Sequence, residues 1–167
     1  MKVTVIANIS VNGKVLLSDN PNHDTPQEAM AFYLKFAKQT GNLVIGKKTY
    51  QLFQQIPDDN KEVFSGIEIV LLSTEPQTTD KHKVVSKPEE AIKYLYEKGF
   101  KEIAVGGGTK TYNSFIEKNL VTDIYFNISP IITGDGGVLA NNIDLNTKFR
   151  LADHIVNDGF IQLFLTR

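Results

Sequence analysis

Short apolar runs alternate with amphipathic stretches along most of this chain. Short apolar runs bounded by turn residues are typical of buried strands, whereas apolar residues spaced three or four apart are typical of helices. Strands are predicted at residues 3–9, 43–45, 67–72, 84–85, 103–105, 123–128 and 131–133. Helices are predicted at about residues 25–39, in a short stretch after residue 46, from residue 86 to Gly99, and at about 110–118.

The helix boundaries carry their own signals. Thr25-Pro26-Gln27-Glu28 and Ser86-Lys87-Pro88-Glu89 have the pattern of a capping box, in which the hydroxyl and the glutamate satisfy free N–H groups. Proline suits the first helical position because its φ is already helical and its N–H is not needed there. Gly41 is expected to end the first helix.

The end of the chain has the pattern of a hairpin. Asn157-Asp158-Gly159 separates two alternating segments at residues 149–156 and 160–165, and such a turn strongly favours antiparallel pairing. Strands that alternate with helices and then close in a hairpin predict an α/β fold. We expect a mostly parallel mixed sheet flanked by helices, with an antiparallel C-terminal hairpin.

Polar turns follow three of the predicted strands directly, at Gly46–Thr49, Ser73–Thr74 and Gly106–Thr111. Because ligands of such sheets gather at the carboxyl ends of parallel strands, we expect these turns to share one edge. In the third turn, Gly106, Gly107 and Gly108 allow close backbone approach and positive φ. They suit a phosphate or dinucleotide loop, or equally a tight strand–helix turn. Thr111 stands where the dinucleotide fingerprint has its third glycine.

Lys47 and Lys48 begin the second predicted helix. The stretch from Gly41 to Lys47 is a near miss for a P-loop, but Lys48 stands where Ser or Thr is required, so we reject an NTPase. Two lysines at a helix start suit a phosphate monoester. The alternative is two solvated lysines, since lysine is mostly exposed.

Composition excludes several functions. The chain has 167 residues, which fits a single domain over 1–167, and a net charge of −1 gives no support for nucleic-acid binding. It contains no cysteine, and its three histidines lack metal-ligand spacing, so we expect no metal site. No apolar run is long enough for a membrane span and no signal peptide is visible, so we expect a cytoplasmic protein.

Several motifs, taken in order, resemble the dihydrofolate reductase superfamily and, within it, the reductase domain of riboflavin biosynthesis. Resemblance extends over nearly the whole chain. It rests on Ser10-Val11-Asn12-Gly13-Lys14, the strand and turn at 43–50, the glycines at 106–108, Leu120-Val121-Thr122-Asp123, and the run from Ile128 to Gly136.

The resemblance implies a dihydrofolate-reductase-like fold and NADPH as cofactor. It places Gly46, Lys47, Lys48 and Thr49 at the 2′-phosphate end, and Ser73 and Thr74 at the adenine ribose. It places Gly106, Gly107, Gly108 and Thr109 at the pyrophosphate, and Ala7 and Asn8 beside the nicotinamide. Analogy with the riboflavin reductases also implies a homodimer.

On the substrate side, the resemblance implies roles for Lys14 and Thr25. Thr25 could instead be only a helix cap. Met30 occupies the position of the acidic residue that holds the pteridine in folate reductases, and a thioether cannot pair with a pteridine. Catalytic residues stay unknown. Asp24 and Glu28 are weak candidates for the proton donor, because acidic residues at a helix start also serve as caps.

We therefore expect an NADPH-dependent reductase of a small heterocycle, most like the reductase of 5-amino-6-(5-phosphoribosylamino)uracil. Its small-molecule substrate would be a ribosylaminopyrimidine. Two alternatives stay open: a true dihydrofolate reductase, and a nucleotide-binding module that kept the fold and lost turnover.

Overall fold

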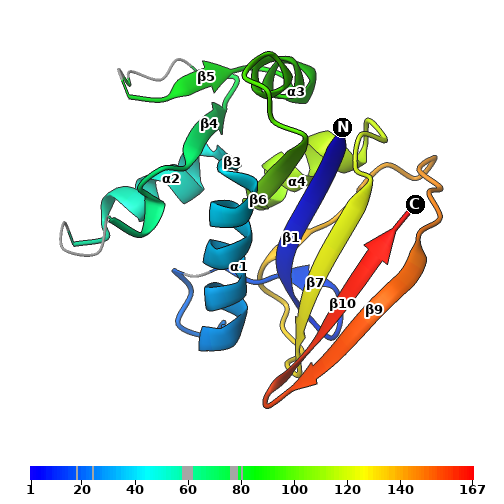
Figure 1. Ribbon diagram of the computed structural model, residues 1–167. Coiled ribbons are helices and arrows are strands. Elements are labelled where there is room, and N and C mark those ends of the chain that lie inside the picture. The colour runs from blue at the N-terminus through cyan, green and yellow to red at the C-terminus, as the bar shows by residue number, and fades with distance from the viewer. Residues whose placement is uncertain (18, 24, 58–61, 76–78, 80) are drawn as a thin grey trace.

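The computed structural model describes residues 1–17, 19–23, 25–57, 62–75, 79 and 81–167. Within these ranges it has ten strands and four α-helices (Figure 1). The strands are β1 (Lys2–Ser10), β2 (Lys14–Val15), β3 (Asn42–Gly46), β4 (Glu68–Leu72), β5 (Lys83–Val85), β6 (Glu102–Gly107), β7 (Asp123–Ser129), β8 (Gly137–Val138), β9 (Arg150–Asn157) and β10 (Phe160–Thr166). The helices are α1 (Gln27–Thr40), α2 (Lys47–Gln54), α3 (Pro88–Glu97) and α4 (Thr109–Ile116).

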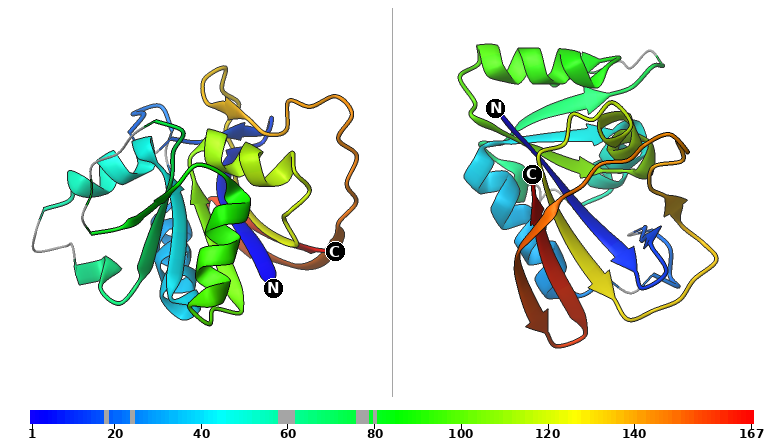
Figure 2. Two further views of the ribbon diagram at one scale, coloured as in Figure 1. Left: turned by 90° about the horizontal axis from the view of Figure 1, so that it is seen from above. Right: turned by 90° about the vertical axis from the view of Figure 1, so that its right-hand side faces the viewer.

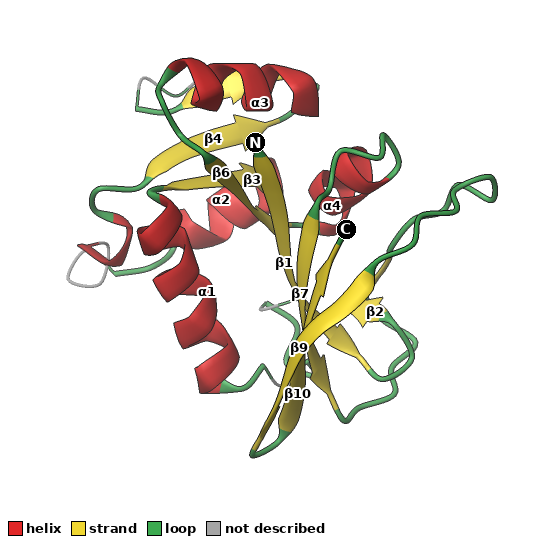
Figure 3. Ribbon diagram, turned by 45° about the vertical axis from the view of Figure 1, so that its right-hand side comes forward, coloured by secondary structure: helices red, strands yellow, loops and turns green. Residues whose placement is uncertain are grey.

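The main sheet has the strand order β5-β4-β3-β6-β1-β7-β10-β9. The pairs from β5 through to β7 are parallel, and β10 is antiparallel to both β7 and β9. Figure 3 shows β9 and β10 extending the sheet beyond β7. The predicted fold class, with its antiparallel C-terminal hairpin, is therefore confirmed.

Helices cover both faces of the sheet (Figure 2). Alternate residues of each strand explain this, because successive side chains point to opposite faces. Leu43 and Ile45 of β3 pack in the cluster that contains α1, while Val44 packs in the cluster that contains α3 and α4. The buried runs of the parallel strands are apolar because both faces lie under helices.

Two expected capping boxes do not form. Pro26, with ψ of 141°, is itself the N-cap of α1, so the Thr25 hydroxyl lies one residue too early to cap the helix. At α3 the N-cap is Lys87, and the Ser86 N–H donates to the Glu90 carboxylate at 2.9 Å. The interaction expected with Glu89 is thus made by the next residue.

One predicted strand is wrong, and two short ones were missed. Residues 131–133 follow Pro130 as irregular backbone, which the Asn12 side chain holds by donating to the Thr133 carbonyl at 3.0 Å. The missed strands β2 and β8 pair with each other over two residues each. Segments this short give no usable periodicity, so only tertiary pairing identifies them.

Candidate functional site

A cavity of about 850 Å³ opens at the carboxyl ends of the parallel strands. Its size falls within the range of about 300–1,000 Å³ that small-molecule sites usually have. The three polar turns after β3, β4 and β6 all line it, as the parallel order predicts. The cavity is therefore the candidate site.

One side of the cavity, here called the helix wall, consists of residues 46–49, 73–75 and 106–110. It contains the first residues of α2 and α4. The N-caps Gly46 and Gly108 are extended glycines, and neither helix start has a side-chain cap hydrogen bond. The first N–H groups of both helices therefore have no side-chain acceptor and form a suitable anion site.

The glycines of the helix wall are required for different reasons. A Cβ on Gly106 would lie 2.2 Å from Tyr33 Oη, and one on Gly46 would lie 2.7 Å from Thr111 Oγ1. Gly107 has a φ of +119°, and the Gly107–Gly108 peptide is cis. A Cβ on Gly108 would make only ordinary contact, 3.6 Å from Thr49 Oγ1. Packing inside the protein thus explains Gly46 and Gly106, backbone conformation explains Gly107, and neither explains Gly108.

Lys47 and Lys48, two of the three lysines of the helix wall, form exposed ion pairs. Lys47 Nζ lies 2.8 Å from Glu75 Oε2, and Lys48 Nζ lies 3.4 Å from Asp19 Oδ2. The hydrogen bond from Lys47 holds the pKa of the Glu75 carboxyl below its usual value. Exposed ion pairs contribute little to stability, so a phosphate of higher charge can compete for these ammonium groups.

A second part of the lining, here called the strand wall, is mostly apolar and carries neutral polar groups. It consists of Ile6, Asn8, Val15, Leu16, Leu17, Thr25, Met30 and Tyr33. Among the described residues that line the whole cavity, the carboxylates are Asp19 and Glu75, and both pair with lysines of the helix wall. An uncharged ring therefore suits the strand wall better than an anion.

Two buried tyrosines connect the cavity to the sheet backbone. Tyr33 Oη donates to the Gly106 carbonyl at 3.1 Å, and Tyr112 Oη donates to the Ile6 carbonyl at 2.6 Å. Burial raises the pKa of both hydroxyls, so both stay neutral near pH 7. Their role here is to fix the strands beneath the cavity.

Most predicted site residues line this cavity, although their roles in binding stay predictions. Those that line it are Asn8, Thr25, Met30, Gly46, Lys47, Lys48, Thr49, Ser73, Thr74, Gly106, Gly107, Gly108 and Thr109.

The other candidates lie elsewhere. Ala7 is fully buried in the cluster with α3 and α4, because its side chain points to the other face of β1. Lys14, on β2, and the exposed Glu28 are not among the residues that line the cavity. Asp24 lies outside the described residues.

Sequence reasoning missed Asp19, Glu75 and Tyr112 as lining residues, whereas Lys110 lies in the turn Gly106–Thr111 that it placed at this edge. Tyr33 of α1 is a core residue that also lines the cavity, with 8% of its surface exposed. No local sequence signal distinguishes these residues from ordinary loop and core positions.

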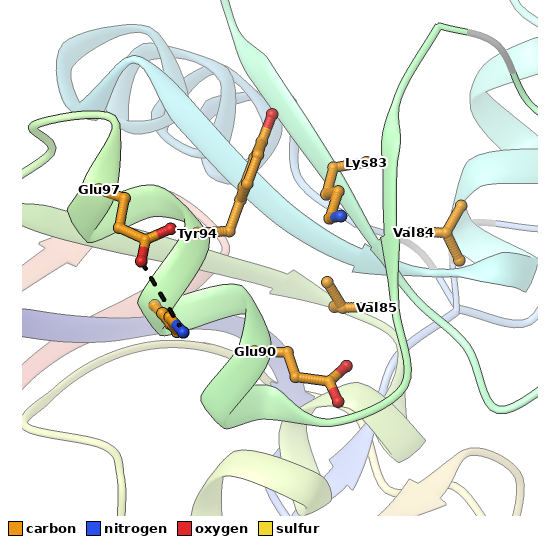
Figure 4. Close-up of a pocket in the computed structure, with 7 residues that line it drawn as sticks. Lys83, Val84, Val85, Glu90, Tyr94 and Glu97 are labelled. Atoms are coloured by element: carbon orange, nitrogen blue, oxygen red, sulfur yellow. Dashed lines mark ion pairs between the residues drawn. The ribbon is translucent and has the colours of Figure 1, made fainter.

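A second depression, of about 230 Å³, lies between β5 and α3 (Figure 4). It is lined by Lys83, Val84, Val85, Glu90, Lys93, Tyr94 and Glu97. Its charges alternate in sign, and Lys93 Nζ pairs with Glu97 Oε1 at 3.9 Å. Lysines and glutamates that offset one another give a ligand little to bind, so the larger cavity is the candidate site.

Residues 1–161 match the family model described as the RibD C-terminal domain. The chain belongs to this family. Family membership supports an oxidoreductase of the riboflavin-pathway pyrimidine reductase type. No curated protein matches the sequence.

Solved structures share the fold at low sequence identity. A Shewanella protein assigned to riboflavin biosynthesis has a TM-score of 0.77 at 23% identity, covering 100% of this chain and 99% of that one. A pyrimidine reductase-like protein from Corynebacterium diphtheriae has a TM-score of 0.76 at 16% identity, covering 99% and 91%.

A third similar structure is the diaminohydroxyphosphoribosylaminopyrimidine deaminase/5-amino-6-(5-phosphoribosylamino)uracil reductase of Thermotoga maritima. Its TM-score is 0.70 at 15% identity, and the match covers 99% of this chain and 56% of that one. These likenesses confirm the fold. Among the described residues, no helix is both long and apolar enough to cross a bilayer.

Proposed function

We propose that this protein is an NADPH-dependent reductase of a ribosylaminopyrimidine, similar in reaction to the 5-amino-6-(5-phosphoribosylamino)uracil reductases. The observation that carries the proposal is the helix wall, where two uncapped helix starts and three lysines line one end of a large cavity. Membership of the RibD C-terminal domain family supports the same reaction class.

The residues present fit a dinucleotide phosphate. Backbone N–H groups at Gly108 and Thr109 would hold the pyrophosphate, and Lys47 and Lys48 would hold the 2′-phosphate. A cofactor bound this way supplies the hydride. Gly108, which has no packing requirement of its own, leaves the backbone open for close approach to the phosphates.

The protein's own contribution is to position two rings and to exclude water between them. The apolar strand wall supplies that environment, with Ile6 on β1 and Met30 on α1. We propose that water delivers the proton to the reduced substrate. Among the described residues, Glu28 is exposed and does not line the cavity, and the lining carboxylates, Asp19 and Glu75, are paired with lysines.

The test is direct. Calorimetry should detect NADPH binding, and 5-amino-6-(5-phosphoribosylamino)uracil should cause NADPH oxidation, followed at 340 nm. Binding of NADPH without oxidation of it by this pyrimidine, by other aminopyrimidines or by pteridines would favour the non-catalytic module. Absence of NADPH binding would contradict the proposal altogether.

We further propose a homodimer, through the exposed edge of the sheet. β9 is the last strand of the described sheet, and its Leu151, Ile155 and Val156 are 53%, 49% and 75% exposed, while Ile161 of the neighbouring β10 is 43% exposed. Exposed apolar residues on an edge strand usually mark a pairing surface. Light scattering should give about twice the monomer mass of 18.6 kDa, and the monomer mass at micromolar concentration would contradict it.

A further inference from the structure

Three buried or half-buried amides form a chain across neighbouring strands and end at the strand wall. Gln162 on β10 is paired in register with Asn127 on β7, which is paired in register with Asn8 on β1. Gln162 Nε2 donates to Asn127 Oδ1 at 2.7 Å, and Asn127 Nδ2 donates to Asn8 Oδ1 at 2.8 Å. Only Asn8 lines the cavity.

These three side chains, Asn8, Asn127 and Gln162, are here called the amide ladder, and burying such polar groups costs free energy. Asn127 is 1% exposed and Gln162 is 6% exposed, in a part of the sheet whose neighbours are largely apolar. Buried amides are tolerated when they are hydrogen-bonded, and each half-satisfied group costs free energy. An apolar residue at these positions would pack more simply, so the ladder points to a requirement at its open end.

The direction of the ladder fixes the polarity of that end. Asn8 uses its side-chain oxygen to accept from Asn127, which leaves both N–H donors of Nδ2 for the cavity. No acceptor for Asn8 Nδ2 is found among the described residues. The main chain is also held, because the Asn8 carbonyl accepts from the Leu16 N–H at 2.9 Å. Asn8 is thus pinned at both its backbone and its side chain.

We infer that Asn8 is a specificity-determining hydrogen-bond donor for a carbonyl oxygen on a ring bound at the strand wall, and that Asn127 and Gln162 are positioning residues that set its polarity. The matching ligand chemistry is an oxo group on a heterocycle or the carboxamide oxygen of a nicotinamide. The inference rests on the proposed function for the identity of these two rings.

Three variants test the polarity. Asn8→Ala removes the donor. Asn8→Asp keeps an acceptor for Asn127 Nδ2, so the ladder and the fold are kept, but the cavity then faces an acceptor. Gln162→Met breaks the ladder at its far end without adding a charge. Asn42→Ala is the matched structural control. Asn42 is a fully buried amide that hydrogen-bonds to the main chain of Glu102 and Ala104, and it does not line the cavity.

The readouts are the dissociation constants of NADPH and of 2′,5′-ADP, and the KM and kcat for 5-amino-6-(5-phosphoribosylamino)uracil. The compound 2′,5′-ADP lacks the nicotinamide. If the nicotinamide carboxamide is the acceptor, Asn8→Ala weakens the binding of NADPH by about 3- to 10-fold and leaves the binding of 2′,5′-ADP unchanged. If the substrate oxo group is the acceptor, NADPH binding is unchanged and KM rises by a similar factor. Either result supports the inference.

Asn8→Asp should weaken the same ligand at least as much as Asn8→Ala does, while its thermal midpoint stays near that of the wild type. In the wild-type background, Gln162→Met should raise whichever of the NADPH dissociation constant and the substrate KM Asn8→Ala raises. Combined with Asn8→Ala, it should have no further effect on that constant. A purely structural role would instead lower the thermal midpoint and affect the ligand equally in both backgrounds. Asn42→Ala should lower the midpoint without changing the ligand constants.

The inference is overturned if Asn8→Ala changes neither ring's binding, or weakens NADPH and 2′,5′-ADP equally. It is also overturned if Asn8→Asp strongly destabilises the fold, because that result means that Asn8 donates to Asn127. Failure of the proposed function gives a different result: the wild type binds neither NADPH nor 2′,5′-ADP. Calorimetry with the pyrimidine alone then still tests Asn8, and no binding of the pyrimidine would overturn the inference too.

Discussion

The helix wall and the strand wall of the cavity obtain their polar groups from different sources. On the helix wall the main chain supplies the donors, at the starts of α2 and α4, and exposed lysines add charge. On the strand wall a side-chain amide, Asn8, supplies the donor, and its orientation comes from two other strands. The first arrangement suits any phosphate, whereas the second distinguishes one ring from another.

The largest expected effect concerns the ring accepted at the strand wall. Dihydrofolate should be a very poor substrate, with kcat/KM well below the usual enzyme range of about 10⁴–10⁸ M⁻¹s⁻¹. Met30 lines the cavity, and the resemblance to folate reductases implies that it stands in place of their carboxylate, whereas a thioether offers only packing. Steady-state assays with NADPH should compare dihydrofolate with 5-amino-6-(5-phosphoribosylamino)uracil. Turnover of dihydrofolate within that range would show that the strand wall is a folate site.

A glycine substitution tests whether the backbone of the helix wall binds the cofactor. Gly107→Ala should weaken NADPH by more than about tenfold, equivalent to about 1.4 kcal/mol. Its φ of +119° is strained for alanine, and the new Cβ would lie 3.0 Å from Tyr112 Oη, so the turn must shift.

The matched control for Gly107→Ala is Gly66→Ala, which has a φ of +76° and no atom within 4 Å of the new Cβ. Both variants should lose thermal stability, but only Gly107→Ala should lose affinity for NADPH. Equal affinity in a folded Gly107→Ala protein would mean that the glycine serves the turn alone.

The lysines test the charge of the helix wall. Replacing both Lys47 and Lys48 by alanine should weaken NADPH by about 1–3 kcal/mol, through lost charged hydrogen bonds, and should weaken NADH less. Calorimetry on both cofactors measures this. The double variant Lys38→Ala/Lys93→Ala removes the same charge from exposed positions on α1 and α3 and should change neither. Equal losses of affinity for NADH and NADPH would show that this wall does not bind the 2′-phosphate.

The smallest expected effect comes from the competition for Lys47. Glu75→Gln should tighten NADPH by a few-fold, because the carboxylate no longer competes with the phosphate for the ammonium. Since the pKa of Glu75 is lowered, its carboxylate stays ionised until the pH falls below the usual glutamate range. The advantage of the variant should therefore persist from neutral pH down through that range. Glu97→Gln is the control, and weaker NADPH binding to Glu75→Gln would show that Glu75 supports the site.

The two walls were also unequally visible in the sequence. The uncapped glycine turns and the lysines follow predicted strands directly, so parallel order alone brought Gly46–Thr49, Ser73–Thr74 and Gly106–Thr109 to one edge. The candidates that failed to reach the cavity, Ala7, Lys14 and Glu28, belong to the other side. Ala7 points to the other face of β1, Glu28 is on the exposed side of α1, and Lys14 lies on the short strand β2.

The sequence by itself determined the fold class, the order of the helices and of the strands in the main sheet, and most of the helix wall. Each follows from local rules: apolar periodicity, glycine at turns, and donors at the first turn of a helix. Only the tertiary structure decided that Asn8, Asn127 and Gln162 meet, or that Tyr33 and Tyr112 exclude side chains from the glycine turn. The sequence separation between Asn8 and Asn127 is 119 residues, and strand register over such a distance has no local signature.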